Sequence, residues 1–225
     1  RRTFLGASAA GVAGLALPHA GQSARAQSID PYTYITTMPT TTDIGQVVGQ
    51  PASEIEPVVA DDRVWDAYVQ LPVKEGQDFH FTCEFDSSWI VLRAYGFDLT
   101  LEEQMEVVGV NNDPEPWYEE TANGYIVWGG DIDEYYCGHY DTNVLTRARC
   151  NAMRKVFDHV GLGVTVTPDR PSIEAALLRG EPVYFKSTVD FLPWRAAEWH
   201  TPDGDVFPVV LTNDHALNVM GFNED

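Results

Sequence analysis

The apolar residues of this chain change their spacing once, close to Gly180. Before that point they recur every three or four residues, as in amphipathic helices, and after it they alternate, as in half-buried strands. The pattern predicts helices over residues 83–95, 100–108, 143–159 and 172–179, and strands over 182–188, 206–211 and 215–222. Helices followed by strands predict an α+β domain in which the helices pack on an antiparallel sheet.

Two stretches show no sustained period. Residues 111–141 are rich in Asp, Glu, Gly, Tyr and Trp, and we expect them to form long surface loops. Residues 27–65 contain Thr, Pro, Gly and Ser in place of a hydrophobic pattern, which predicts a linker or loosely ordered arm. The folded domain is therefore expected over residues 66–225.

The first 26 residues read as a targeting segment. Arg1 and Arg2 precede a short apolar stretch that ends in Ala24-Arg25-Ala26, which is the order of a bacterial signal peptide with a small-residue cleavage site. The paired arginines resemble a twin-arginine signal, which directs export after folding. A membrane anchor is the alternative, but the apolar run is short and rich in Gly and Ala. We expect an exported, extracytoplasmic protein with no stable membrane insertion after cleavage.

Acidic residues outnumber basic ones by 34 to 14, which gives a formal charge of −20. A chain this acidic repels nucleic acid and anionic membrane surfaces, so neither is an expected partner. The sequence has no glycine-rich phosphate loop, dinucleotide fingerprint or metalloprotease helix. We therefore expect no cofactor and no metal. We also expect a monomer.

Three cysteines leave one unpaired thiol if an exported protein forms a disulfide. Cys137 and Cys150 lie close enough in sequence to pair, and three reduced cysteines are the open alternative. Cys83 stands apart from them in the first turn of a predicted helix, after Thr82 as a possible N-cap. A helix N-terminus favours the thiolate form of cysteine, although Glu84 and Asp86 in the same turn oppose it.

Two further residues stand in an order that suits thiol chemistry. Gln77 lies six residues before Cys83, where an amide could help the cysteine N–H bind an oxyanion. His215 heads an apolar strand more than a hundred residues later. A nucleophilic cysteine with its histidine remote in sequence is typical of acyl-transfer enzymes.

These residues, in the order Gln77, Cys83-Glu84, Arg93-Ala94-Tyr95-Gly96, Arg179-Gly180-Glu181-Pro182 and Asp214-His215-Ala216, carry a resemblance to a known family. The chain from Gln77 to Asp225 resembles the bacteriocin-processing (double-glycine leader) family of papain-like cysteine peptidases, especially its secreted stand-alone members. The resemblance implies a papain-like fold, in which the helical part carries the nucleophile and the antiparallel sheet carries the histidine.

The resemblance also implies roles for these residues in the cleavage of peptide or amide bonds. Cys83 would be the nucleophile, His215 its base and Gln77 an oxyanion donor. Phe85 and Asp86 depart from the small apolar residues that follow the Cys-Glu pair in the family. The family also places an Asp or Asn on the strand after the histidine. We expect either that this strand lies beyond Asp225 or that another residue takes the role. A catalytically inactive relative that binds peptides or wall fragments, and a thiol acyltransferase, are the alternative functions.

Other candidate residues have simpler interpretations. His80 is expected to be packed or half-exposed, and the acidic stretch 131–134 with His139 and Asp141 is expected to be a solvated surface and not a calcium site. Trp194, Trp199 and His200 are predicted to lie in a loop before the last strands, where they could line a substrate cleft or simply cover the core.

Overall fold

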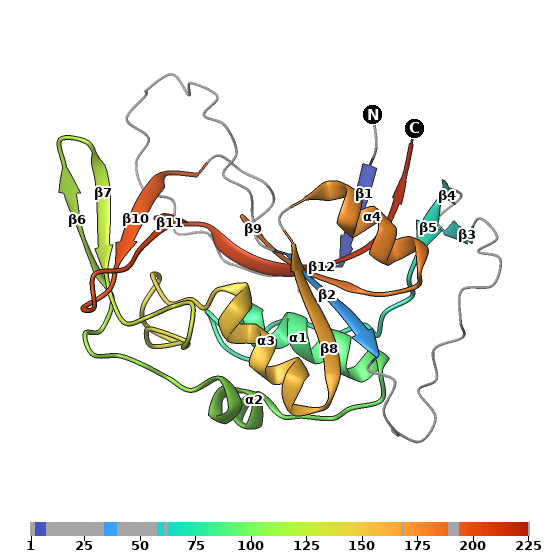
Figure 1. The fold of residues 1–225 in the computed structure, drawn as a ribbon, viewed down its shortest axis with the longest axis horizontal. Helices are drawn as coiled ribbons and strands as arrows, with labels where there is room; N and C mark the ends of the chain where they lie inside the picture. Colours follow the sequence, from blue (N-terminus) through green and yellow to red (C-terminus); the bar gives the residue numbers. More distant parts are fainter. Residues whose placement is uncertain are drawn as a thin grey trace.

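In a computed structural model of the protein, shown in Figure 1, the described residues are 63–167, 169–188 and 194–224, with three strands before them. These strands are β1 (Thr3–Ala7), β2 (Tyr34–Pro39) and β3 (Val58–Ala60). Apart from β1, the predicted signal peptide lies outside the described residues. β2 and β3 fall within the segment predicted as a linker or arm.

The larger sheet has six strands in the order β1-β12-β9-β2-β8, with β5 paired to β12 as well. All its pairings are antiparallel. The bounds of its other strands are β5 (Ala67–Tyr68), β8 (Leu162–Thr167), β9 (Val183–Thr188) and β12 (Asp214–Asn223). The predicted strands 182–188 and 215–222 are therefore confirmed, and β8 is an additional strand.

A second sheet of four strands has the order β11-β10-β7-β6. Its strands are β6 (Trp117–Thr121), β7 (Gly124–Trp128), β10 (Ala196–His200) and β11 (Val206–Val210). The prediction of only loops over residues 111–141 was wrong, because β6 and β7 form a hairpin there. β10 and β7 run parallel, so this sheet is mixed. Separately, β4 (Arg63–Trp65) pairs with β3.

Four helices are described: α1 (Cys83–Ala94), α2 (Leu101–Val108), α3 (Cys150–His159) and α4 (Arg170–Leu178). α1 ends at Ala94, and Gly96 follows it with a φ of 82°, which suits the left-handed turn after a helix. The capping box predicted at Thr100 is present, with Thr100 and Glu103 bonding each other's backbone amides. At α4 the N-cap is Asp169 and not Ser172, which instead donates its amide to Asp169.

The third helix starts seven residues later than predicted. The backbone of Arg147 pairs with Cys137, with both N–H···O distances 3.0 Å. This pairing holds the preceding residues in turns, and the side chain of Asn143 accepts the amide of Leu145 within them. A long-range backbone contact therefore overrides the helical spacing of residues 143–149.

The six-stranded sheet separates two apolar cores, as Figure 1 shows with α1 and α3 on one side of β12 and α4 on the other. Ala216 and Tyr184 belong to the core under α1 and α3. Leu217 and Val219 belong to the core under α4. The chain therefore folds as an α+β protein, with helices packed on an antiparallel sheet.

None of the helices within the described ranges is long and apolar enough to cross a membrane.

Candidate active site

Cys83 is the first residue of α1 and is 7% exposed. Thr82 precedes the helix as predicted, but its hydroxyl caps no helix amide. It donates instead to the Asp86 carboxylate at 2.7 Å. The start of α1 is therefore fixed by this side-chain bond and by the Thr82 carbonyl, which accepts the amides of Phe85 and Asp86 at 2.9 Å.

The sulfur of Cys83 meets the strand that carries the predicted histidine. The backbone amide of Ala216 donates to Cys83 Sγ at 3.3 Å, across 133 positions of sequence. Standard bond lengths then place the Cα atom of His215 within about 6 Å of the sulfur. The fold thus brings together the two segments that the sequence singled out.

The contact lies at an edge of β12. On one side β12 pairs with β9 from Asp214 to Val219, and on the other β1 pairs only from Asn218 onward. Among the described strands, none adjoins the second edge at Ala216, and Cys83 Sγ accepts the amide there. The thiol occupies the position that a neighbouring strand's carbonyl would take in a continuous sheet.

The direction of His215 follows from the pleat of β12. Ala216 and Asn218 face α1, since Ala216 packs in its core and Asn218 donates to the Ser87 carbonyl at 3.1 Å. Leu217 and Val219 face α4. Alternation places the Cβ atom of His215, a buried residue, on the α4 face. The His215 side chain thus leaves β12 on the face opposite α1, and contact between its ring and the thiol would have to run around the free edge of β12.

A buried group of charges adjoins the thiol. Lys186 Nζ lies 2.6 Å from Glu84 Oε1 and 2.6 Å from Asp214 Oδ2. The second oxygen of Glu84 accepts a hydrogen bond from Cys83 Sγ at 3.2 Å. Glu84 is 1% exposed and Lys186 is 7% exposed, so these charges interact with little screening by water.

This environment favours the neutral thiol. Burial raises the pKa of Cys83 well above its ordinary value of 9.0, and the charge of Glu84 raises it further. The charge of Lys186 and the amide of Ala216 act in the opposite direction but do not compensate. The pKa of Lys186 is itself raised, because Asp214 and Glu84 outweigh the effect of burial. The site therefore holds a protonated thiol beside a charged ammonium at neutral pH.

The predicted oxyanion donor is engaged elsewhere. Gln77 Nε2 donates to the carbonyls of Phe79 and His80, at 3.0 Å and 3.1 Å. An amide nitrogen has two hydrogens, so these bonds use its whole donor capacity. The structure brings Cys83 and the His215 segment together, and it uses Gln77 to shape the loop before α1.

A second lysine organises this loop. Lys74 Nζ lies 2.8 Å from Asp78 Oδ1 and 2.9 Å from Asp86 Oδ1. Burial raises the pKa of Asp86, although its bonds to Thr82 and Lys74 oppose the shift. Both carboxylates in the first turn of α1, Glu84 and Asp86, are thus paired with a lysine.

Several other candidates lie apart from this site. His80 is an exposed residue whose Nδ1 lies 2.7 Å from Asp141 Oδ1. Cys83, Cys137 and Cys150 are all reduced cysteines in the structure, and no disulfide joins them. No three His, Cys, Asp or Glu side chains in the described part of the chain are arranged to hold a metal ion.

The loop predicted around Trp199 is a strand. Trp199 is fully buried in β10, and its indole N–H donates to the Gly130 carbonyl at 2.8 Å. His200, also in β10, is partly buried beside Trp128 with ring centroids 5.0 Å apart. Trp199 therefore belongs to the core under the second sheet and lines no cleft.

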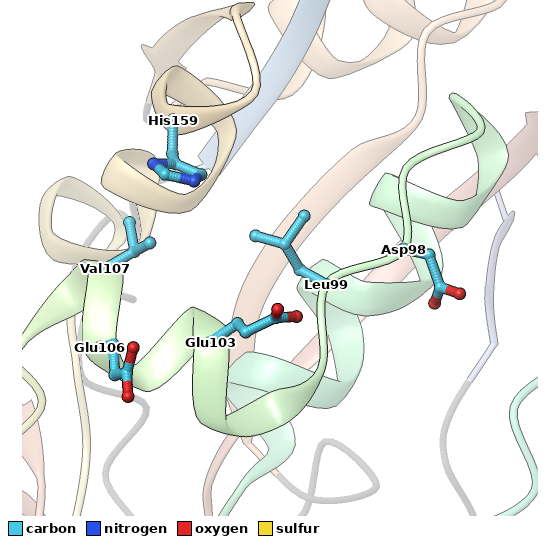
Figure 2. Close-up of a pocket in the computed structure, with 6 residues that line it drawn as sticks. All are labelled: Asp98, Leu99, Glu103, Glu106, Val107 and His159. Atoms are coloured by element: carbon cyan, nitrogen blue, oxygen red, sulfur yellow. The ribbon is translucent and has the colours of Figure 1, made fainter.

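A surface hollow lies between α2 and the end of α3. Figure 2 shows the side chains that line it, with Val107 next to the His159 imidazole and the carboxylates of Asp98 and Glu106 pointing away from it: Asp98, Leu99, Glu103, Glu106, Val107 and His159. Glu103 already serves the capping box of α2. The hollow contains neither Cys83 nor the charges beside it, so it is separate from the candidate site.

Lys186 and Asp214 are the members of the site that the sequence reasoning missed. Lys186 is a lone basic residue in the apolar strand Val183–Thr188, which is an available signal for a buried ion pair. Asp214 was named from the sequence only as part of the Asp214-His215-Ala216 motif. Its side chain instead bonds Lys186, on the α1 face.

Comparisons with protein-family models, with curated proteins and with solved structures found no match to this chain.

Proposed function

We propose that this protein is an exported cysteine peptidase or amidase of papain-like fold, in which Cys83 attacks the carbonyl of a peptide or amide bond. The observation that carries the proposal is the 3.3 Å contact between Cys83 Sγ and the amide that follows His215. Nucleophilic cysteine chemistry needs the histidine side chain within hydrogen-bond reach of the thiol, so the proposal requires the His215 ring to reach Cys83 Sγ around the free edge of β12.

The reaction starts from the neutral thiol. His215 takes the proton of Cys83, and the thiolate forms a bond to the carbonyl carbon while the carbonyl electrons move to oxygen. The oxyanion is stabilised by backbone N–H groups at the start of α1. His215 then gives its proton to the departing amine as the C–N bond breaks, and water hydrolyses the resulting thioester. Gln77 joins the oxyanion donors only after releasing the carbonyls of Phe79 and His80.

Export is supported by the sequence alone, through the arginine pair and the Ala24-Arg25-Ala26 site. It is tested by expressing the chain with its first 26 residues in a bacterium that has a twin-arginine pathway. The expected product is extracytoplasmic and begins at Gln27. A product that stays in the cytoplasm with Arg1 intact would contradict export.

A second candidate function is peptide binding by an inactive relative. The buried, protonated state of Cys83 and the engagement of Gln77 favour it. The two functions are separated by incubating wild type and Cys83→Ser with a mixed peptide library and reading cleavage by mass spectrometry. Cleavage by wild type that is lost in Cys83→Ser supports the peptidase, whereas retention of peptides without cleavage by either protein supports the binding module.

Acyl transfer to an amine shares the first half of this chemistry. Adding an amine such as hydroxylamine to the same incubation distinguishes the two reactions. Products that carry the amine in preference to water indicate a transferase, and unchanged hydrolysis indicates a peptidase.

A further inference from the structure

Lys186 connects the two segments that form the candidate site. Its ammonium lies 2.6 Å from Glu84 Oε1 in α1 and 2.6 Å from Asp214 Oδ2 in β12, while Lys186 itself belongs to β9. Glu84 directly follows Cys83, and Asp214 directly precedes His215. One side chain thus bonds the sequence neighbours of both proposed catalytic residues.

We propose that Lys186 is a positioning residue, whose bonds to Glu84 and Asp214 hold the Cys83 sulfur against the His215–Ala216 segment. The inference rests on the proposed function for its catalytic meaning, but the geometry that it concerns can be measured without a substrate.

Because Lys186, Glu84 and Asp214 are largely buried, the loss of one of them is costly. Lys186 and Glu84 are nearly inaccessible to water, and the Asp214 side chain is 16% exposed. Removing one partner of a buried ion pair leaves the other charge uncompensated, which costs several kcal/mol. If the first turn of α1 and the start of β12 separated, a buried charge would therefore either be exposed to water or lose its partner. The contact joins Cys83, the residue before Glu84, to Ala216, two residues after Asp214.

The chain offers a matched control in Lys74. This lysine also holds two carboxylates, Asp78 and Asp86, and its side chain is 13% exposed. Asp86 lies in the same turn of α1 as Glu84, but the bonds of Lys74 join α1 to the preceding loop and not to β12. Loss of Lys74, a partly buried lysine, therefore tests for a general effect of removing a lysine that pairs with two carboxylates.

The experiment measures hydrogen exchange of the Ala216 amide relative to that of Val219, deeper in the same strand. The proteins are wild type, Lys186→Met, Lys186→Arg and Lys74→Met, compared at equal temperature and pH. We expect the ratio of Ala216 to Val219 exchange rates to rise at least tenfold in Lys186→Met. It should stay within about threefold of wild type in Lys186→Arg, which keeps the charge, and in Lys74→Met.

If Lys186→Met does not fold, the double variant Glu84→Gln/Lys186→Met is measured in its place. It removes one positive and one negative charge, so the net charge of the protein is unchanged. The same tenfold rise is expected in it. An unchanged ratio in the folded lysine variants, or an equal rise in Lys74→Met, overturns the proposal. Because exchange needs no substrate, a wild type that cleaves nothing would contradict the proposed function and leave this test decisive.

Discussion

The Ala216 amide donates to the sulfur of Cys83 where β1 no longer covers the edge of β12. A strand edge presents unpaired amide groups, and here the first residue of α1 satisfies one of them. The helix that carries the thiol is therefore docked on the strand by a backbone bond, and the position of the sulfur depends on the sheet register.

The first prediction concerns the charge beside the thiol. Glu84 raises the pKa of Cys83 and is also its hydrogen-bond acceptor, so Glu84→Gln should lower that pKa. A lower pKa gives proportionally more thiolate at a pH well below the pKa. We expect Cys83 to react with iodoacetamide about tenfold faster at pH 8 in this variant, as measured by mass spectrometry of the Cys83 peptide.

Glu106→Gln is the control for this measurement. Glu106 is exposed on α2, and its substitution removes one negative charge, as Glu84→Gln does. It should react like wild type. A slower reaction of Cys83 in Glu84→Gln than in wild type would show that the carboxylate promotes ionisation of the thiol, contrary to this account.

The free energy of unfolding should fall at alkaline pH. Burial raises the pKa values of Cys137 and Cys150 to about 12, and that of Cys83 well above 9.0. The unfolded chain therefore loses these protons first as the pH rises, so the stabilisation is complete below pH 9 and is lost progressively above it. At pH 10 the expected loss is about 1.4 kcal/mol per thiol, or about 4 kcal/mol in total.

Urea unfolding at pH 8 and pH 10 measures this loss. Cys150→Ala should reduce the difference between the two pH values by about one third, whatever its effect on absolute stability. If the variant shows the same loss as wild type, the thiol of Cys150 does not contribute in the way described.

The interior of the second sheet gives a further prediction. Trp199 is fully buried and its indole is hydrogen-bonded to Gly130, so Trp199→Ala should lower the free energy of unfolding by about 3–5 kcal/mol. Trp117→Ala, at a residue that is 49% exposed, should change it by less than about 1 kcal/mol. Chemical denaturation followed by circular dichroism measures both, and equal losses in the two variants would place Trp199 outside the core.

The parts of the fold that sequence predicted well are governed by local interactions. The helix opened by Cys83 and closed before Gly96 follows from its apolar spacing and its terminal glycine, and the capping box at Thr100 involves residues only three apart. The β6–β7 hairpin was missed although Asn123-Gly124 between two aromatic stretches is a strong turn signal. Glu119 and Glu120 interrupt the apolar alternation of β6, so the strand lacks the period that predicts one.

The parts that sequence could not predict depend on register between distant segments. The bond between Lys186 and Glu84 spans 102 positions and exists only because β9, β12 and α1 meet in one arrangement. The early part of the predicted third helix was lost for the same reason, when Arg147 paired with Cys137. Apolar spacing carries no information on such pairings.

The central claim is that Cys83 and His215 act as a pair, and labelling with an epoxide inhibitor of thiol peptidases tests it most directly. Stoichiometric modification of Cys83 by wild type, at a rate at least a hundredfold above that of free cysteine and lost in His215→Ala, is the predicted result. Labelling of wild type no faster than free cysteine, or labelling unaffected by His215→Ala, would contradict it.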